Sequence, residues 1–277
     1  MYNFGKNCII SENAKIGENV SLGHNCIIED NVVIEDNCKI DHNTIIRYGT
    51  RLGADSFVGS NCIIGEYMND YILEGKHDDY SLEIGSNALI RSGSIIYSNS
   101  KIGEHFQTGH QVTIREKSEI GNHVSIGTLS DIQGLCHIGN YVRLHSNVHI
   151  GQHSVLDDYV WIFPYVVLTN DPTPPSNELL GVHVHSFAII ATGSVLLPGV
   201  EINQDALVGA GAVVTKNVGK YKVAVGNPAK EIADVRNLKN KITGEPAYPW
   251  RYHYSHNMPW EGCSFEEWAD KCGINIE

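Results

Sequence analysis

The sequence predicts an all-β solenoid, a rod of stacked parallel coils, and three observations in its 277 residues predict it. A large apolar residue recurs at every sixth position in three stretches, 4–64, 84–168 and 190–214, with Thr108 as the exception. A small or β-branched residue, such as Cys26, stands four positions after most of them. Gly and Asn are frequent in between. A period of six fits a short strand plus a turn, three of which complete one triangular coil of 18 residues.

The three stretches hold 11, 15 and 5 six-residue units, 31 in all, which predicts about ten coils. Neighbouring coils then stack at about 4.8 Å, the spacing of paired strands. The Gly and Asn residues fall where the chain turns a corner, and both residue types tolerate positive φ there. A β-sandwich, whose strands simply alternate apolar and polar residues, would not keep a six-residue apolar period in phase over such a length.

Composition excludes several classes of protein. A formal net charge of −12 disfavours a nucleic-acid partner, because phosphate recognition needs clustered Lys and Arg. No apolar run approaches the roughly 18 residues of a membrane span, and the first residues lack a signal-peptide layout, so a cytoplasmic protein without membrane contact is expected. Five of the seven cysteines share one inward repeat position, and no Cys-x-x-Cys pair exists, so neither disulfides nor a metal are expected.

Breaks in the period divide the chain. We expect a repeat domain over 1–230 with insertions at 65–83 and 170–186, followed by a C-terminal segment, 231–277. The first insertion is polar with three tyrosines and either covers a ligand on a neighbouring subunit or is simply solvated. The second is rich in proline and reads as a rigid arm.

The C-terminal segment predicts two helical pieces and an aromatic tail. A helical stretch is expected up to about residue 242, and Ser264 to Glu267 has the spacing of a capping box that starts a short helix. The aromatic residues between them either cap an exposed coil edge or stack on a nucleotide base.

The repeat over about residues 4–230 resembles the hexapeptide-repeat acyltransferase superfamily. That resemblance implies left-handed parallel β-helices, usually assembled as trimers. Outward apolar residues of the later coils favour the same assembly, with active sites at subunit boundaries. These residues are Trp161, Phe163, Val167, Ile189, Val195, Leu197, Leu207 and Val213.

One face brings candidate catalytic groups together. Residues 18 apart stand directly above one another, so Asp131 lies one coil spacing from His149. A carboxylate at that distance orients an imidazole and raises its pKa, as a general base requires. His145, on the adjoining face, is the second candidate base.

Other polar residues near this face are candidates for substrate binding. Arg115 is suited to hold a diphosphate by charge-assisted hydrogen bonds, and His110 sits where Thr108 breaks the apolar register. The full set is His110, Arg115, Gln133, Asn147, Asn170 and Asp171.

The last repeats are similar to the ending of coenzyme A-dependent superfamily members. There, small residues let the pantetheine lie along the coils while backbone groups hydrogen-bond it. In this chain, lysines after the last repeats are suited to meet the phosphates. The residues carried over are Ala191, Gly193, Ala210, Gly211, Lys216 and Lys230, with Lys222 as a further basic group.

The narrower resemblance is to bacterial dTDP-3-amino-3,6-dideoxyhexose N-acetyltransferases, carried by residues 106–110, 114–116, 168–171 and 225–230. It implies direct acetyl transfer from acetyl-CoA, in a ternary complex, to the amine of a dTDP- or UDP-linked amino-deoxy sugar, in lipopolysaccharide or S-layer glycan biosynthesis. An O-acetyltransferase, a zinc-dependent β-helical carbonic anhydrase and a non-catalytic scaffold stay open. Acceptor tests, metal analysis and coenzyme A binding, respectively, discriminate them.

Overall fold

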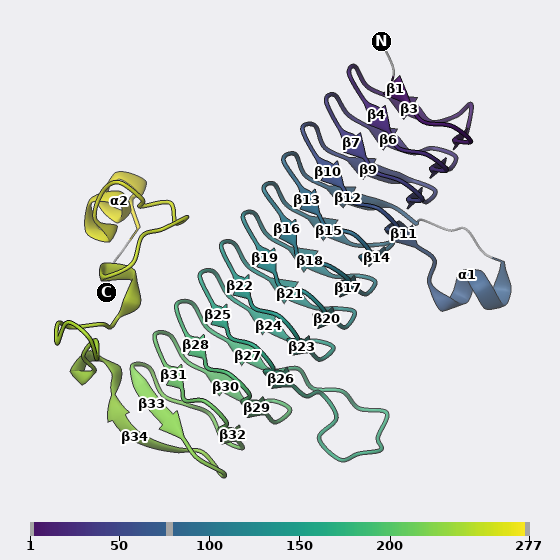
Figure 1. Cartoon of the computed structure of the whole chain (residues 1–277). Coiled ribbons are helices and arrows are strands. Elements are labelled where there is room, and N and C mark those ends of the chain that lie inside the picture. Colours follow the sequence, from purple (N-terminus) through teal and green to yellow (C-terminus); the bar gives the residue numbers. More distant parts are fainter. Residues whose placement is uncertain (1–2, 76–79, 275–277) are drawn as a thin grey trace.

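The computed structural model describes residues 3–75 and 80–274, and it has the predicted left-handed parallel β-helix (Figure 1). Very short strands form three parallel sheets, here called A, B and C, which are the faces of a triangular rod. From β1 to β32, successive strands belong to A, B and C in turn, so each of these coils gives one strand to each face. Within the described residues, no helix is long and apolar enough to span a bilayer.

The strands are as follows. Sheet A contains β1 (Asn3–Phe4), β4 (Ser21–Leu22), β7 (Lys39–Ile40), β10 (Phe57–Val58), β13 (Leu89–Ile90), β16 (Gln107–Thr108), β19 (Ser125–Ile126), β22 (Arg143–Leu144), β25 (Trp161–Ile162), β28 (Ile189–Ile190), β31 (Leu207–Val208), β33 (Lys222–Val225) and β34 (Lys230–Asp234). Sheet B contains β2 (Ile9–Ile10), β5 (Ile27–Ile28), β8 (Ile45–Ile46), β11 (Ile63–Glu66), β14 (Ile95–Tyr97), β17 (Thr113–Ile114), β20 (Asp131–Ile132), β23 (His149–Ile150), β26 (Val167–Leu168), β29 (Val195–Leu196) and β32 (Val213–Val214). Sheet C contains β3 (Lys15–Ile16), β6 (Val33–Ile34), β9 (Thr50–Leu52), β12 (Leu82–Ile84), β15 (Lys101–Ile102), β18 (Glu119–Ile120), β21 (His137–Ile138), β24 (Val155–Leu156), β27 (His183–Val184) and β30 (Glu201–Ile202).

The rod is slightly longer than the period indicates. In the described part of the chain, β27 and β33 are strands of the parallel stacks that the count of apolar sixth positions leaves out. Val184 of β27 is fully buried although it lies inside the expected insertion 170–186, so that insertion ends earlier than predicted. The long interruption conceals the point at which the six-residue period resumes, which is Val184, six residues before Ile190.

The inward positions form one continuous core. The isoleucines, leucines and valines at every sixth position are buried from Leu22 onward, with the small residues packed between them. All seven cysteines are free, and the repeat cysteines Cys26, Cys38, Cys62 and Cys136 are buried. Burial raises the pKa of Cys136 to about 12, so this thiol is not a nucleophile near neutral pH.

The exception at Thr108 has a structural explanation. Its hydroxyl accepts a hydrogen bond from the Arg91 backbone N–H at 2.9 Å and lies 3.4 Å from the Ser94 hydroxyl, so the buried polar atom is satisfied. Phe106, which occupies the small position two residues earlier, is completely buried. The large and small side chains have exchanged places in this segment, which keeps the core filled.

We expect Phe106→Ala to lower the free energy of unfolding by about 3 to 5 kcal/mol, the usual cost of removing a buried aromatic ring. Thr108 cannot fill the cavity. Chemical denaturation followed by circular dichroism measures the change, and Phe57→Ala, which removes a ring that is 37% exposed on sheet A, is the matched control with a small effect. Equal losses in both variants would contradict this description of the core.

The corners explain why the chain tolerates so many residues with positive φ. The corner between sheets C and A has Asn19 and Asn37 in the early coils, as the sequence predicts. Later coils place rings there instead, also at positive φ, and the rings stack with centroids 4.5 to 5.4 Å apart. This aromatic ladder consists of His105, His123, Tyr141, Tyr159 and Phe187.

Both insertions leave the rod after a strand of sheet B and return before a strand of sheet C, so they project from the same edge. The first contains the short helix α1 (Asn69–Glu74), and its residues 76–79 lie outside the described residues. Its Tyr67 donates a hydrogen bond to Glu29 at 2.6 Å and lies under the Arg47 guanidinium, so this insertion packs on its own rod.

The segment after Lys230 differs from the prediction. The expected helix up to residue 242 is wrong, because residues 230–234 form β34, which pairs antiparallel with β33 and ends sheet A. A 3₁₀ turn, Val235–Asn237, follows, and another spans Trp250–Tyr252. The predicted short helix is present as α2 (Phe265–Cys272), with the Ser264–Glu267 capping box formed.

The aromatic tail, residues 248–274, packs along the side of the rod rather than over its end (Figure 1). Its rings contact Tyr159, Trp161 and Phe187, so part of the apolar surface predicted to lie between subunits is covered by the chain itself. Arg251 fixes this arrangement through a buried ion pair with Asp205 and lies over the Phe187 ring.

Candidate functional site

Asp131 and His149 form the dyad that the 18-residue coil predicts. They are register partners on β20 and β23, and His149 Nδ1 lies 3.1 Å from Asp131 Oδ2. Gln133 donates a second hydrogen bond to the same oxygen at 2.6 Å. Both dyad side chains are partly exposed on sheet B, so an acceptor can approach them.

The hydrogen bonds to Asp131 determine which nitrogen of the His149 imidazole is available to accept a proton. The hydrogen bond from His149, followed by that from Gln133, holds the pKa of the Asp131 carboxyl below its usual range, so this group is ionised at neutral pH. A carboxylate at Nδ1 favours the tautomer with its proton there, which leaves the Nε2 lone pair available. Within the described residues, Nε2 makes no hydrogen bond, so it is suited to accept a proton from a substrate.

Arg115 is less available than the sequence indicates. Its guanidinium makes two hydrogen bonds of 2.9 Å to Glu116 and lies 5.4 Å from the centre of the Tyr97 ring. The Glu116 carboxylate also raises the pKa of Arg115. A phosphate at this position would have to share the guanidinium with a carboxylate that already holds it in a bidentate arrangement.

His145 follows β22 and lies against an aromatic surface. Its ring stacks on Phe163 with centroids 4.6 Å apart and also faces Trp161. Burial lowers the pKa of His145 below the usual range of an imidazole, so the ring is neutral at physiological pH. The geometry therefore favours His149 over His145 as the base.

The remaining candidates lie near the edge where sheets A and B meet, or next to the second insertion. His110 and Asn147 are corner residues of this A–B edge, and the His110 side chain is exposed. Asn170 follows β26 and lies close to Gly151, and Gly151 stands one coil above Gln133. Asp171 accepts hydrogen bonds from Thr173 and Ser176, so it organises the proline-rich insertion.

The residues expected to contact coenzyme A lie on the last coils. Gly193 and Gly211 are stacked at the A–B edge with positive φ, and a Cβ on either would meet nothing within 4 Å. This bare edge continues the line of His110 and Asn147. The exposed Lys216 and Lys230 lie beyond it toward the end of the rod, and Ala191 and Ala210 precede the two glycines in their turns.

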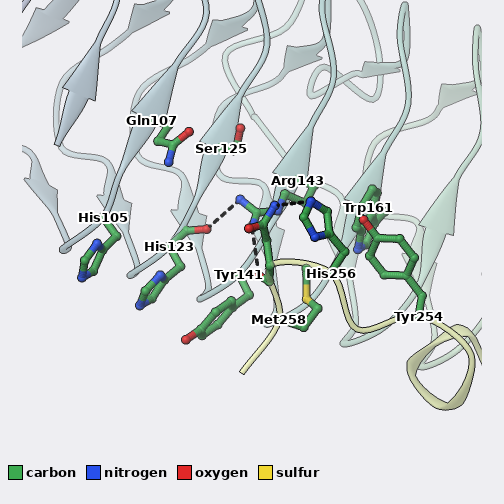
Figure 2. Close-up of a pocket in the computed structure, with 11 residues that line it drawn as sticks. His105, Gln107, His123, Ser125, Tyr141, Arg143, Trp161, Tyr254, His256 and Met258 are labelled. Atoms are coloured by element: carbon green, nitrogen blue, oxygen red, sulfur yellow. Dashed lines mark hydrogen bonds between the residues drawn. The ribbon is translucent and has the colours of Figure 1, made fainter. Parts of the chain in front are cut away.

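A separate pocket of about 460 Å³ lies over sheet A, where the aromatic tail closes against the rod (Figure 2). Arg143 lies in its wall and donates hydrogen bonds to the backbone oxygens of His123 and Asn257. Figure 2 shows its guanidinium between the rod and the tail. None of the eleven residues that line the pocket is acidic; they are His105, Gln107, His123, Ser125, Tyr141, Arg143, Trp161, Tyr254, His256, Asn257 and Met258.

Sequence reasoning missed this pocket, because its walls come from coils and tail segments that lie more than 90 residues apart in the sequence. The available signal was the series of rings at one corner position, 18 residues apart, beginning at His105.

Family models match two parts of the chain. The bacterial transferase hexapeptide model matches residues 4–35 and 31–66, and the hexapeptide repeat of succinyl-transferase matches residues 191–216. The second match covers the bare A–B edge with Gly193 and Gly211.

Two curated relatives illustrate the similarity. A Schizosaccharomyces pombe protein named as an acetyltransferase is 41% identical over 58 residues, which is 21% of this chain and 28% of that protein. The galactoside O-acetyltransferase of Escherichia coli K12 is 32% identical over 114 residues, 33% of this chain and 56% of that enzyme. The matches thus span only about a quarter to just over half of these relatives.

Among solved structures, a UDP-N-acetylglucosamine acyltransferase is 21% identical, with a TM-score of 0.46, covering 83% of this chain and 73% of that one. The repeat matches at both ends of the rod, together with its six-residue architecture, support the resemblance of this chain to the hexapeptide-repeat acyltransferase superfamily.

Proposed function

We propose that this protein transfers an acetyl group from acetyl-CoA to the amine of a nucleotide-linked amino-deoxy sugar. The observation that carries the proposal is the 3.1 Å contact between Asp131 and His149, which leaves one imidazole nitrogen free above an open face. The acetyltransferase names of the relatives and the resemblance in residues 168–171 support the reaction class, and the narrower choice of acceptor rests on the resemblance in residues 106–110 and 114–116.

The proposed reaction is a direct transfer. The amine nitrogen attacks the thioester carbonyl while His149 Nε2 takes the proton that the nitrogen releases. The C–S bond then breaks, and the departing thiolate receives a proton from the imidazolium, which Asp131 stabilises. Holding both reactants in line supplies a large part of the rate enhancement, at best roughly 7 to 11 kcal/mol.

The shape of the rod supports an arrangement for both substrates. Acetyl-CoA would lie along the bare A–B edge at Gly193 and Gly211, with its phosphates toward Lys216 and Lys230. Its thioester would then point down the edge toward the coil that carries His149. The acceptor would contact Gln133 and the residues around it, with His110, Asn147 and Asn170 as further polar groups.

A homotrimer belongs to this proposal. Directly above His149 on sheet B stand Val167, Val195 and Val213, which are partly exposed and apolar. Such a surface is suited to a subunit contact, which would enclose the dyad between two chains.

The proposal is tested by following thiol release from acetyl-CoA with purified protein and a panel of dTDP- and UDP-linked 3-amino and 4-amino sugars. Turnover with one amino sugar, and none with its hydroxyl analogue, is the expected result. Release with hydroxyl acceptors alone would favour the O-acetyltransferase, and no binding of coenzyme A would favour a non-catalytic scaffold.

We also infer that the pocket over sheet A binds an anionic group. Arg143 has two backbone oxygens as partners, histidines surround it, and no lining residue carries a carboxylate. With UDP as the probe in calorimetry, Arg143→Gln should weaken binding about tenfold or more, since a hydrogen bond to a charged group contributes about 1.5 to 3 kcal/mol. Lys101→Gln, an equal charge loss on sheet C, should leave the affinity unchanged; equal effects would contradict the assignment.

A further inference from the structure

Two histidines and a carboxylate meet on sheet C, away from the dyad. Asp157 follows β24, His183 begins β27, and His185 follows that strand. Asp157 Oδ1 lies 3.0 Å from His183 Nε2, and Asp157 Oδ2 lies 3.1 Å from His185 Nδ1. The two imidazole centroids are 3.9 Å apart, and one possible ligand atom from each residue lies within 4.8 Å of the others.

The second nitrogen of His185 is the informative atom. His185 Nε2 is buried and makes no hydrogen bond within the described residues. Its nearest charged neighbour is Glu201 Oε2 at 3.8 Å, on the next strand of the sheet. If a neutral His185 donates its Nδ1 proton to Asp157, then Nε2 carries a lone pair that faces a carboxylate, which is two acceptors without a proton between them.

A metal ion resolves this conflict. When Nδ1 binds a cation instead of donating a proton, the neutral ring keeps its proton at Nε2, where it faces Glu201. Metal-binding histidines commonly donate their other N–H to a carboxylate in this way. A bound metal ion would also place its positive charge between two carboxylates, Asp157 and Glu201. No Lys or Arg forms an ion pair with either of them in the described structure.

We propose that Asp157, His183 and His185 bind one divalent transition-metal ion of the Zn²⁺ class. Two imidazole nitrogens and one carboxylate oxygen suit Zn²⁺ or Co²⁺, whereas Ca²⁺ and Mg²⁺ prefer oxygen ligands. Ligand bonds of about 2.0 to 2.2 Å need only small movements of donors that already lie this close. Asp158, the next residue, is excluded because it accepts hydrogen bonds from Asn140.

The β-helical carbonic anhydrase considered from the sequence would need three histidines that converge across two subunits, whereas all three ligands proposed here come from one chain. It also reverses the expectation of no metal. That expectation rested on the lack of a Cys-x-x-Cys pair, and the insertion between Asp157 and His183 conceals that β24 and β27 are paired strands.

The test is a titration of the tag-free, full-length chain, stripped with a chelator, with Zn²⁺ by calorimetry and with Co²⁺ by visible absorption. We expect one ion per chain. His183→Ala and His185→Ala should each weaken binding at least about a hundredfold, and Glu201→Gln about ten- to a hundredfold. His137→Ala is the matched control, since His137 lies on the same face and pairs with Glu119 in the described structure.

Circular dichroism confirms that each variant is folded, and Asp157→Asn provides a third ligand change that keeps the side-chain shape. Failure of the native chain to bind either ion, or equal affinity in the ligand variants and the His137 control, would overturn the proposal.

Discussion

Replacing His149 by Gln should lower kcat for acetyl transfer by about 10² to 10⁴, the usual contribution of a positioned general base. Gln keeps the polarity and approximate size of the side chain but cannot accept the proton from the attacking amine. Asp131→Asn should have a smaller effect, because it removes the group that orients the imidazole and stabilises its protonated form. Steady-state assays of thiol release with the acceptor found in the panel measure both.

A double variant that combines Asp131→Asn with His149→Gln tests more directly whether the two residues act together. If the two residues act as a unit, Asp131→Asn should cost almost nothing further once His149 is absent. His137→Gln, which disrupts an exposed histidine–carboxylate pair on sheet C, is the control and should retain full activity. A His149→Gln protein with undiminished kcat would mean that the amine loses its proton to solvent, and the dyad would have no catalytic role.

The largest effect on stability is expected for Arg251→Ala. The Arg251 and Asp205 side chains are 3% and 1% exposed, so removing the guanidinium leaves a buried carboxylate without its partner. Breaking such a pair costs about 3 to 5 kcal/mol, and here it makes docking of the aromatic tail onto the rod less favourable by that amount. All four tryptophans belong to that cluster, so their fluorescence and limited proteolysis of the tail report the loss.

The pH dependence provides a second check on the same variant. Burial raises the pKa of Asp205 even though Arg251 opposes the shift. Without Arg251 the pKa in the docked state rises further, so docking is favoured at low pH and is lost as pH rises through that raised pKa. The defect should therefore be smaller near about pH 4, close to the ordinary pKa of Asp, than at pH 7.

Arg236→Ala is the control for the tail, because Arg236 forms an exposed ion pair with Asp234. Surface pairs of this kind contribute little, and no measurable change in fluorescence is expected. An Arg251→Ala protein with native fluorescence and native resistance to protease at pH 7 would show that the ion pair does not hold the tail.

The rod could be predicted because each coil repeats one local rule. Eighteen residues per coil follow from the apolar period, and that number places Asp131 under His149 without further information. The inward cysteines and the Ser264 capping box also depend on near neighbours in sequence, and the structure confirms them.

Features that depend on long-range packing could not be predicted. The helix expected after Lys230 is replaced by β34, because pairing with the exposed edge of β33 outweighs local helix preference. The availability of Arg115 to a phosphate depends on Glu116, an adjacent residue whose side-chain direction the period does not specify. The rings at positive φ are stabilised by stacking and by a tail that lies far away in sequence.

The central claim is that the acetyl group passes to a sugar nitrogen, and the product of the reaction tests it most directly. We would incubate the native protein with acetyl-CoA and the amino-deoxy nucleotide sugar that releases thiol fastest, and identify the product by NMR. The account predicts an amide, with the acetyl carbonyl coupled to the sugar N–H. An acetyl ester on a hydroxyl, or free acetate with an unchanged sugar, would contradict it.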